Sequence, residues 1–135
     1  MAITLKRIIG VTYKSGDATI SAPTSTYTGP GASEYKGSIP DASTDLTIDF
    51  NVDVSAVVTL LLYSTKNMTL KFYNGASLVV TLLLTAGVPI VWADDHTETC
   101  PITGDCTKVK VTNASGAVAD LVMDALMDTS PSIAD

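Results

Sequence analysis

Charged and aromatic side chains are scarce in this chain of 135 residues. It has one arginine, Arg7, seven scattered lysines, one histidine and eight aromatic residues, and its formal net charge is −6. Binding to nucleic-acid phosphates requires a basic patch, so we expect no nucleic-acid partner. The length suits one domain with a buried core and is too short for two ordinary ones. We therefore expect a single domain spanning residues 1–135.

Glutamate is also rare, and this scarcity bears on the fold class. Asp supplies twelve of the fourteen acidic residues, and the chain contains nineteen Thr and twelve Ser. Glu favours helices, whereas Asp favours turns and helix caps and Thr favours strands. The composition predicts an all-β fold.

Apolar segments of the chain were compared with a secretory signal and with a membrane-spanning segment, and neither is predicted. The first ten residues hold no apolar run long enough for a secretory signal, so we expect the chain to stay in the compartment where it is made. Residues 72–93 carry no charge and are long enough to span a membrane. However, Asn74-Gly75 and Gly87-Val88-Pro89 interrupt that stretch, and its Val and Thr content is typical of strands. We expect no membrane partner.

Short segments with the two-residue periodicity of strands recur along the chain. Residues 1–14 predict one strand, ended by Ser15-Gly16-Asp17. Residues 45–54 alternate between apolar side chains and Asp, Thr or Asn, as a half-buried strand does. Further β-rich segments lie at 57–63, 68–73, 77–84, 88–92 and 107–112. Asn74-Gly75 predicts a type I′ hairpin between two of them. Seven or eight short strands predict an antiparallel β-sandwich, which we expect to be jelly-roll-like.

The last periodic segment, residues 117–127, fits both a helix and a strand. Asp120, Asp124 and Asp128 recur every four residues beside a helical apolar stripe. We favour the strand because an all-β sheet needs a closing partner. As a strand, the segment would turn alternate apolar side chains inward: Leu121, Met123, Ala125 and Met127. Residues 129–135 are expected to be a frayed tail.

A long Ser/Thr/Gly/Pro-rich segment separates the first strand from the denser second half. Between Ser15 and Thr44, twenty-two of thirty residues are Ser, Thr, Gly, Pro or Ala. A loop of this length is usually functional or ordered by a partner, and Tyr27 and Tyr35 would anchor such an arm. The alternative is a surface loop with one short strand near Ala18–Ala22. Both interpretations remain open at this stage.

No arrangement of residues predicts catalysis or a bound cofactor. His96 is the only histidine, and no nucleophile elbow, zinc-protease helix or phosphate-binding loop is present. Acidic, His and Cys side chains gather between Asp94 and Cys106, but their spacing fits no standard zinc pattern. We expect no catalytic residue, no metal and no cofactor.

The two cysteines allow a single internal bridge. Cys100 and Cys106 flank a turn-like stretch that would set them opposite each other. Without a secretory signal the chain is expected in a reducing compartment, where thiols persist. We predict that both cysteines are reduced.

Three segments of the second half carry a resemblance to a known group of proteins. In order, they are Met68–Gly75, Val80–Trp92 and Thr107–Gly116. They resemble small virion proteins of tailed bacteriophages, in which a strand, an L-x-A-G-x-P-x-x-W turn and a V-T-N-A-S-G hairpin precede a closing strand. The resemblance covers residues 45–128 and consists of turn and core residues, so it transfers no active site. The pattern is weaker in the closing strand, at Asp120, Asp124 and Ala125.

The resemblance implies a structural role. Phage proteins similar in size and fold are cement or decoration proteins, which bind the outside of the capsid across joints between major capsid subunits. It implies a non-enzymatic protein, made in the host cytoplasm and located on the capsid exterior of the virion. Its partners would be the major capsid protein and itself, as a homodimer or homotrimer. The acidic net charge suits a site away from packaged DNA.

Candidate capsid or subunit contacts lie in and before the long segment: Arg7, Tyr27, Pro30 and Tyr35. An alternative function is a carbohydrate- or receptor-binding β-sandwich of a phage tail or cell surface. That function would need exposed aromatic side chains on one face, and few are available.

Overall fold

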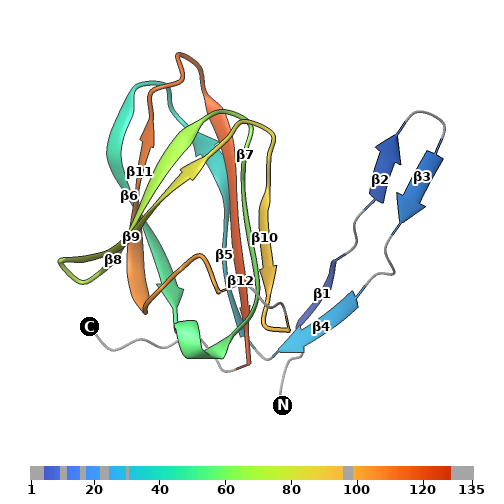
Figure 1. The fold of residues 1–135 in the computed structure, drawn as a ribbon. Helices are drawn as coiled ribbons and strands as arrows, with labels where there is room; N and C mark the ends of the chain where they lie inside the picture. The colour runs from blue at the N-terminus through green and yellow to red at the C-terminus, as the bar shows by residue number, and fades with distance from the viewer. Residues whose placement is uncertain are drawn as a thin grey trace.

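The structure is a computed structural model that describes residues 5–9, 12–15, 18–21, 25–29, 31–95 and 99–128. In these ranges twelve strands account for most residues, and a short 3-10 turn, η1 (Val54–Ala56), accompanies them (Figure 1). The strands are β1 (Leu5–Ile9), β2 (Thr12–Ser15), β3 (Ala18–Ser21), β4 (Ser25–Gly29), β5 (Gly31–Ile39), β6 (Ser43–Val52), β7 (Val57–Ser64), β8 (Met68–Asn74), β9 (Ser77–Leu84), β10 (Ile90–Ala93), β11 (Cys106–Asn113) and β12 (Ala119–Met127). The all-β prediction is confirmed.

Strands β5 to β12 form a β-sandwich with jelly-roll topology. One sheet has the order β10-β7-β12-β5 and the other the order β6-β11-β8-β9. All of these pairings are antiparallel. The first of the eight strands pairs with the last, β6 pairs with β11, β7 with β10, and β8 with β9. Nested pairing of eight strands over two sheets is the jelly roll that the sequence predicted.

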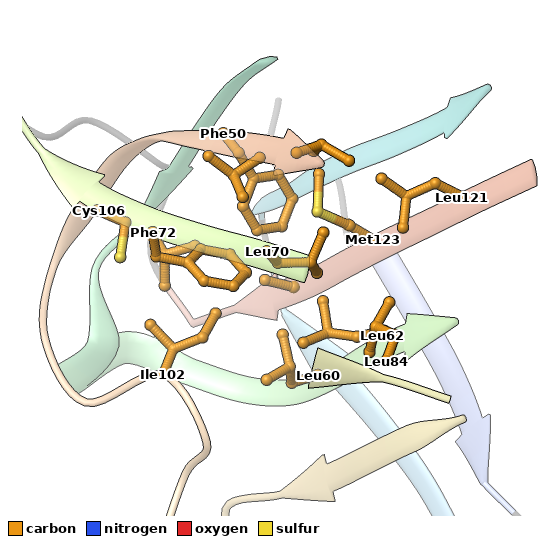
Figure 2. Packing of buried hydrophobic residues seen from close by; sticks show 14 of the residues in the cluster. Phe50, Leu60, Leu62, Leu70, Phe72, Leu84, Ile102, Cys106, Leu121 and Met123 are labelled. Carbon is orange, nitrogen blue, oxygen red and sulfur yellow. The ribbon is translucent and has the colours of Figure 1, made fainter. Parts of the chain in front are cut away.

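The core fills the space between the two sheets. Phe50 on β6 and Phe72 on β8 pack with their ring centroids 6.3 Å apart and tilted by 56°, a favourable geometry for aromatic pairs. Fully buried aliphatic side chains from both sheets surround them (Figure 2). They include Leu60, Leu62, Leu70, Leu121 and Met123.

The ambiguous last segment is the strand β12, and the helical alternative is wrong. β12 lies between β5 and β7 in its sheet, so both of its edges are paired. The side chains predicted to face inward are buried: Leu121, Met123, Ala125 and Met127. Leu126, which the alternation placed on the other face, is buried as well. The aspartates between them lie on the outer face of the sheet, where Asp120 is exposed and Asp124 half-buried.

The described part of the predicted first strand contains two strands, β1 and β2. The segment 15–44 is not a long loop or arm throughout, because it contains β3, β4 and β5. Its first half holds β3, near the short strand that one alternative placed at Ala18–Ala22, and β4. Its second half holds all of β5, which pairs with β12 from Ile39 opposite Ala119 to Gly31 opposite Met127. A ladder of backbone hydrogen bonds needs few apolar side chains, which is why this strand escaped a search for hydrophobic alternation.

The hairpin between β8 and β9 also differs from its prediction. Asn74 pairs with Ser77, so Gly75 and Ala76 form the two-residue loop. Gly75 has a φ of +59°, whereas Asn74 and Ala76 do not have positive φ. A positive φ at the first loop position alone is typical of a type II′ turn rather than type I′.

The chain before β5 forms two small sheets outside the sandwich. β1 and β4 pair as a two-stranded sheet, called here the N-terminal ribbon. β2 and β3, the distal hairpin, pair as a second one. Figure 1 shows the ribbon at one end of the sandwich, with the distal hairpin beyond it and away from both sheets. The arm therefore ends at Gly29 rather than at Thr44.

Candidate functional site

Arg7 attaches the N-terminal ribbon to the outer face of the sheet that contains β12. Its Nε donates a hydrogen bond to Oδ2 of Asp124 at 2.8 Å, and its Nη2 donates to Oδ1 of Asp124 at 3.2 Å. Nη2 also forms an ion pair with Glu34. Asp124 and Glu34 lie directly opposite each other on β12 and β5. A bidentate Arg–carboxylate pair fixes orientation as well as distance.

The surroundings of Arg7 favour its protonated, positively charged form. The side chains of Arg7 and Asp124 are 23% and 14% exposed, so water screens their ion pair only partly. The hydrogen bond with Asp124 raises the pKa of Arg7 above its ordinary value, against the effect of burial. The guanidinium is thus a permanent cation at the base of the ribbon.

The other ribbon strand contacts the sandwich at two points. The hydroxyl of Tyr27 donates to the carboxylate of Asp95, which follows β10, with oxygen–oxygen distances of 3.0 and 3.3 Å. At the end of β4, a Cβ on Gly29 would lie 2.3 Å from the carbonyl oxygen of Met127. Only glycine allows this close approach of β4 to β12. Arg7 and Tyr27 are themselves paired across the ribbon.

The four predicted contact residues do not all lie in the same part of the fold. Arg7 and Tyr27 meet at the base of the ribbon, where they position it by contacts within the chain. Tyr35 is a half-buried residue of β5 that packs against the core, with Gly37 beside its hydroxyl. Pro30 lies outside the described residues. Of the three that the structure describes, Arg7 and Tyr27 form a common site and Tyr35 lies apart from it.

A hollow of about 220 Å³ separates the ribbon from strands β7 and β10. Its lining is mostly apolar, with the Arg7–Asp124 pair on one side: Arg7, Ile8, Ile9, Thr59, Leu60, Leu61, Val91 and Asp124. The sequence did not predict this hollow because its walls come from four parts of the chain that are thirty or more residues apart. The exposed apolar side chain of Ile8, next to Arg7, was the available signal.

A larger hollow of about 570 Å³ lies at the ends of β8, β9 and β11. Of the residues that line it, Lys66 alone has an ionisable side chain, and the others are Asn67, Met68, Thr69, Leu83, Leu84, Thr85, Ala86, Thr112, Ala114 and Ser115. This lining offers no acid–base pair of the kind that general acid–base catalysis uses.

Both cysteines are free thiols, as predicted. Burial raises the pKa of Cys106 to about 12, and the neighbouring Asp105 and Cys100 add to the effect. Burial also raises the pKa of Cys100. A thiol with a raised pKa forms little thiolate at neutral pH, which lowers its reactivity.

The structure describes no metal centre in the ranges given above. Within those ranges, no three His, Cys, Asp or Glu side chains are grouped so that they could hold a metal ion. His96 itself lies outside the described residues. None of the described residues belongs to a helix long and apolar enough to cross a membrane.

Comparison with known proteins identifies no family for this chain. No family model matches it, and no curated protein matches it. A solved structure with some similarity comes from work on Bacillus endospore appendages, described as a novel family of disulfide-linked pili. The two chains are 13% identical with a TM-score of 0.36, over 73% of this chain and 90% of the other.

Proposed function

We propose that this chain is a non-enzymatic cement or decoration protein of a phage virion, which binds the outside of the capsid and bridges major capsid subunits. The observation that carries the proposal is the distal hairpin. β2 and β3 are four residues each and form a sheet of their own, which Figure 1 shows away from the sandwich. A lone two-stranded hairpin is marginally stable in water, so it gains most from a neighbouring subunit that covers it.

The ribbon anchors the base of the arm to the sandwich. Arg7, Tyr27 and Gly29 tie β1 and β4 to the sandwich at separate points. An arm held in this way loses less conformational entropy when it binds than a free arm does. It therefore supports bridging between one subunit, which holds the sandwich, and the next, which the hairpin reaches.

Stabilisation of the shell would follow from linkage. A ligand that binds the assembled lattice better than free subunits shifts the equilibrium toward the lattice. Many identical weak contacts, repeated over a shell, add through multivalency. The net charge of −6 suits the outer surface, since it would be repelled by packaged DNA.

The alternative, a carbohydrate- or receptor-binding sandwich, receives less support. Such binding uses aromatic side chains gathered on one face. Tyr63 lies on β7 and Tyr73 on β8, in different sheets. Trp92 is half-buried and packs against the core.

Fractionation of virions tests the proposal directly. Heads and tails are separated after disruption, and this chain is measured in each fraction by mass spectrometry. We expect it with the heads, cross-linked by a short amine-reactive reagent to the major capsid protein. Recovery with tails alone would refute the capsid role and favour the receptor-binding alternative. The tail tube protein, followed in the same fractions, controls for incomplete separation.

A further inference from the structure

We propose that two copies of this chain associate through strand β9, in an antiparallel β9–β9 pair around a two-fold axis. The inference stands independently of the capsid role, because it rests on the edges of the sandwich alone. A sheet edge presents unpaired backbone donors and acceptors, which makes it a template for another strand unless the sequence blocks it.

The sandwich has four edges, and three of them carry protection. β6 presents the exposed acids Asp45 and Asp49, and β5 presents the exposed charges of Glu34 and Lys36. β10 is four residues long and faces β1 of the ribbon across the smaller hollow. Charged side chains and short length are the usual means by which edges resist pairing.

β9 has neither charged side chains nor short length as protection, and the one irregularity in its pairing with β8 is a register shift at Val79, near its start. Its eight residues, Ser77–Leu84, include no charge, proline or glycine. Leu78 is 54% exposed and Leu83 is 73% exposed. Of the residues that the structure describes, those of β8 alone pair with the β9 backbone. Within the described part of the chain its outer backbone edge is thus unpaired, and two of its large apolar side chains are exposed.

The pattern of the four edges favours a second copy as the occupant. If β9 met another edge of this chain, it would face either charged side chains or a short strand. In an antiparallel two-fold pair, β9 meets the same uncharged sequence, so no like charges are brought together. The acidic β6 edges of the two copies then lie at opposite ends of a combined eight-stranded sheet, which limits repulsion between two chains of charge −6.

From Val80 to Leu84 the alternation of β9 is compatible with such a joint. Leu82 and Val80 are half-buried and pack against the core, whereas Thr81 is exposed and lies opposite Lys71 on the neighbouring strand. A two-fold axis perpendicular to the sheet keeps inward side chains on the inward face of both copies. An isologous interface of this kind closes as a dimer and does not extend further.

Sedimentation equilibrium on the full chain tests the pairing. We expect wild-type protein to form a dimer of twice the 14.1 kDa chain mass. Thr81→Lys places like charges across the axis, and Leu83→Lys replaces an exposed apolar side chain of the same strand by a charge. Neither change disturbs the core, and we expect each to weaken dimerisation roughly tenfold or more. Val118→Lys is the matched control, since Val118 is 60% exposed but lies outside β9. It should dimerise like wild type.

A cross-link locates the joint. Thr81→Cys places a thiol near the proposed axis, and mild oxidation should give a covalent dimer of this variant, with Val118→Cys as control. Wild-type protein that stays monomeric at roughly 100 μM would overturn the proposal. So would dimers that survive both lysine substitutions in β9, equal weakening by Val118→Lys, or open-ended polymers in place of a closed dimer.

Discussion

Arg7 holds the N-terminal ribbon against the sandwich through its contacts with Asp124 and Glu34. Its rarity singled it out, because it is the only arginine in the chain. Its partners were not predictable, since Asp124 lies 117 residues away and only the pairing of β5 with β12 places Glu34 beside it. Tyr35, in a Gly- and Ser-rich segment, was predicted to anchor the arm, and it is packed against the core of the sandwich.

Replacement of Arg7 tests its part in holding the ribbon. We expect Arg7→Met to lower the free energy of unfolding by about 1–3 kcal/mol, because the carboxylate of Asp124, 14% exposed, loses its charged hydrogen-bond donors. Urea denaturation measures this loss. Hydrogen exchange should also become faster in residues 5–9 and 25–29, as the ribbon leaves the sheet.

Lys6→Met is the matched control, because Lys6 is an exposed neighbour on the same strand. It should leave both measurements close to wild type. Arg7→Lys should fall between the two, since a lysine cannot make the bidentate contact. Unchanged exchange in the ribbon of Arg7→Met would show that other contacts hold it.

At the scale of elements, β12 and β5 differ in what the sequence could reveal. β12 carries large apolar side chains at alternate positions, so its strand character was predictable despite the four-residue spacing of its aspartates. β5 is its neighbour in the sheet, but Gly, Ala and Ser fill most of its positions. Small side chains leave no hydrophobic period to detect, and the strand exists because its backbone pairs along the whole of β12.

Two adjacent residues of β12 provide the test for this element. Met123 is fully buried between the sheets, and Met123→Asp would place a carboxylate in the core without a partner. We expect a loss of several kcal/mol and failure to fold. Val122 lies on the outer face opposite Lys36 and Tyr63, so Val122→Asp should fold, with a loss below about 1 kcal/mol. Circular dichroism and thermal unfolding distinguish the outcomes, and a folded Met123→Asp protein would contradict the inward placement of Met123.

At the scale of the whole molecule, the sequence predicted the architecture of the sandwich better than it predicted where the arm ends and the sandwich begins. The number and spacing of apolar segments predicted a jelly roll, and the nested pairing of β5 to β12 confirms it. The limit of the arm was wrong by fifteen residues, because the Ser15–Thr44 segment looked uniform in composition. Its division at Gly29 depends on the close approach of that residue to Met127, which is a contact between distant parts of the chain. Deletion of residues 25–38 would therefore remove β5 from the sandwich.

The pairing register of the ribbon shows where the distal hairpin can be removed without changing the sandwich. Ile9 lies opposite Ser25, so residues 10–24 can be replaced by an Asn-Gly turn that joins β1 to β4 directly. The distal hairpin is removed while Arg7, Tyr27 and Gly29 stay in place. We expect the melting temperature to change by less than about 3 °C, because Figure 1 places β2 and β3 away from the sandwich. Binding to isolated capsids, measured by co-sedimentation, should fall sharply. Wild-type binding by the shortened chain would show that the sandwich, rather than the hairpin, contacts the shell.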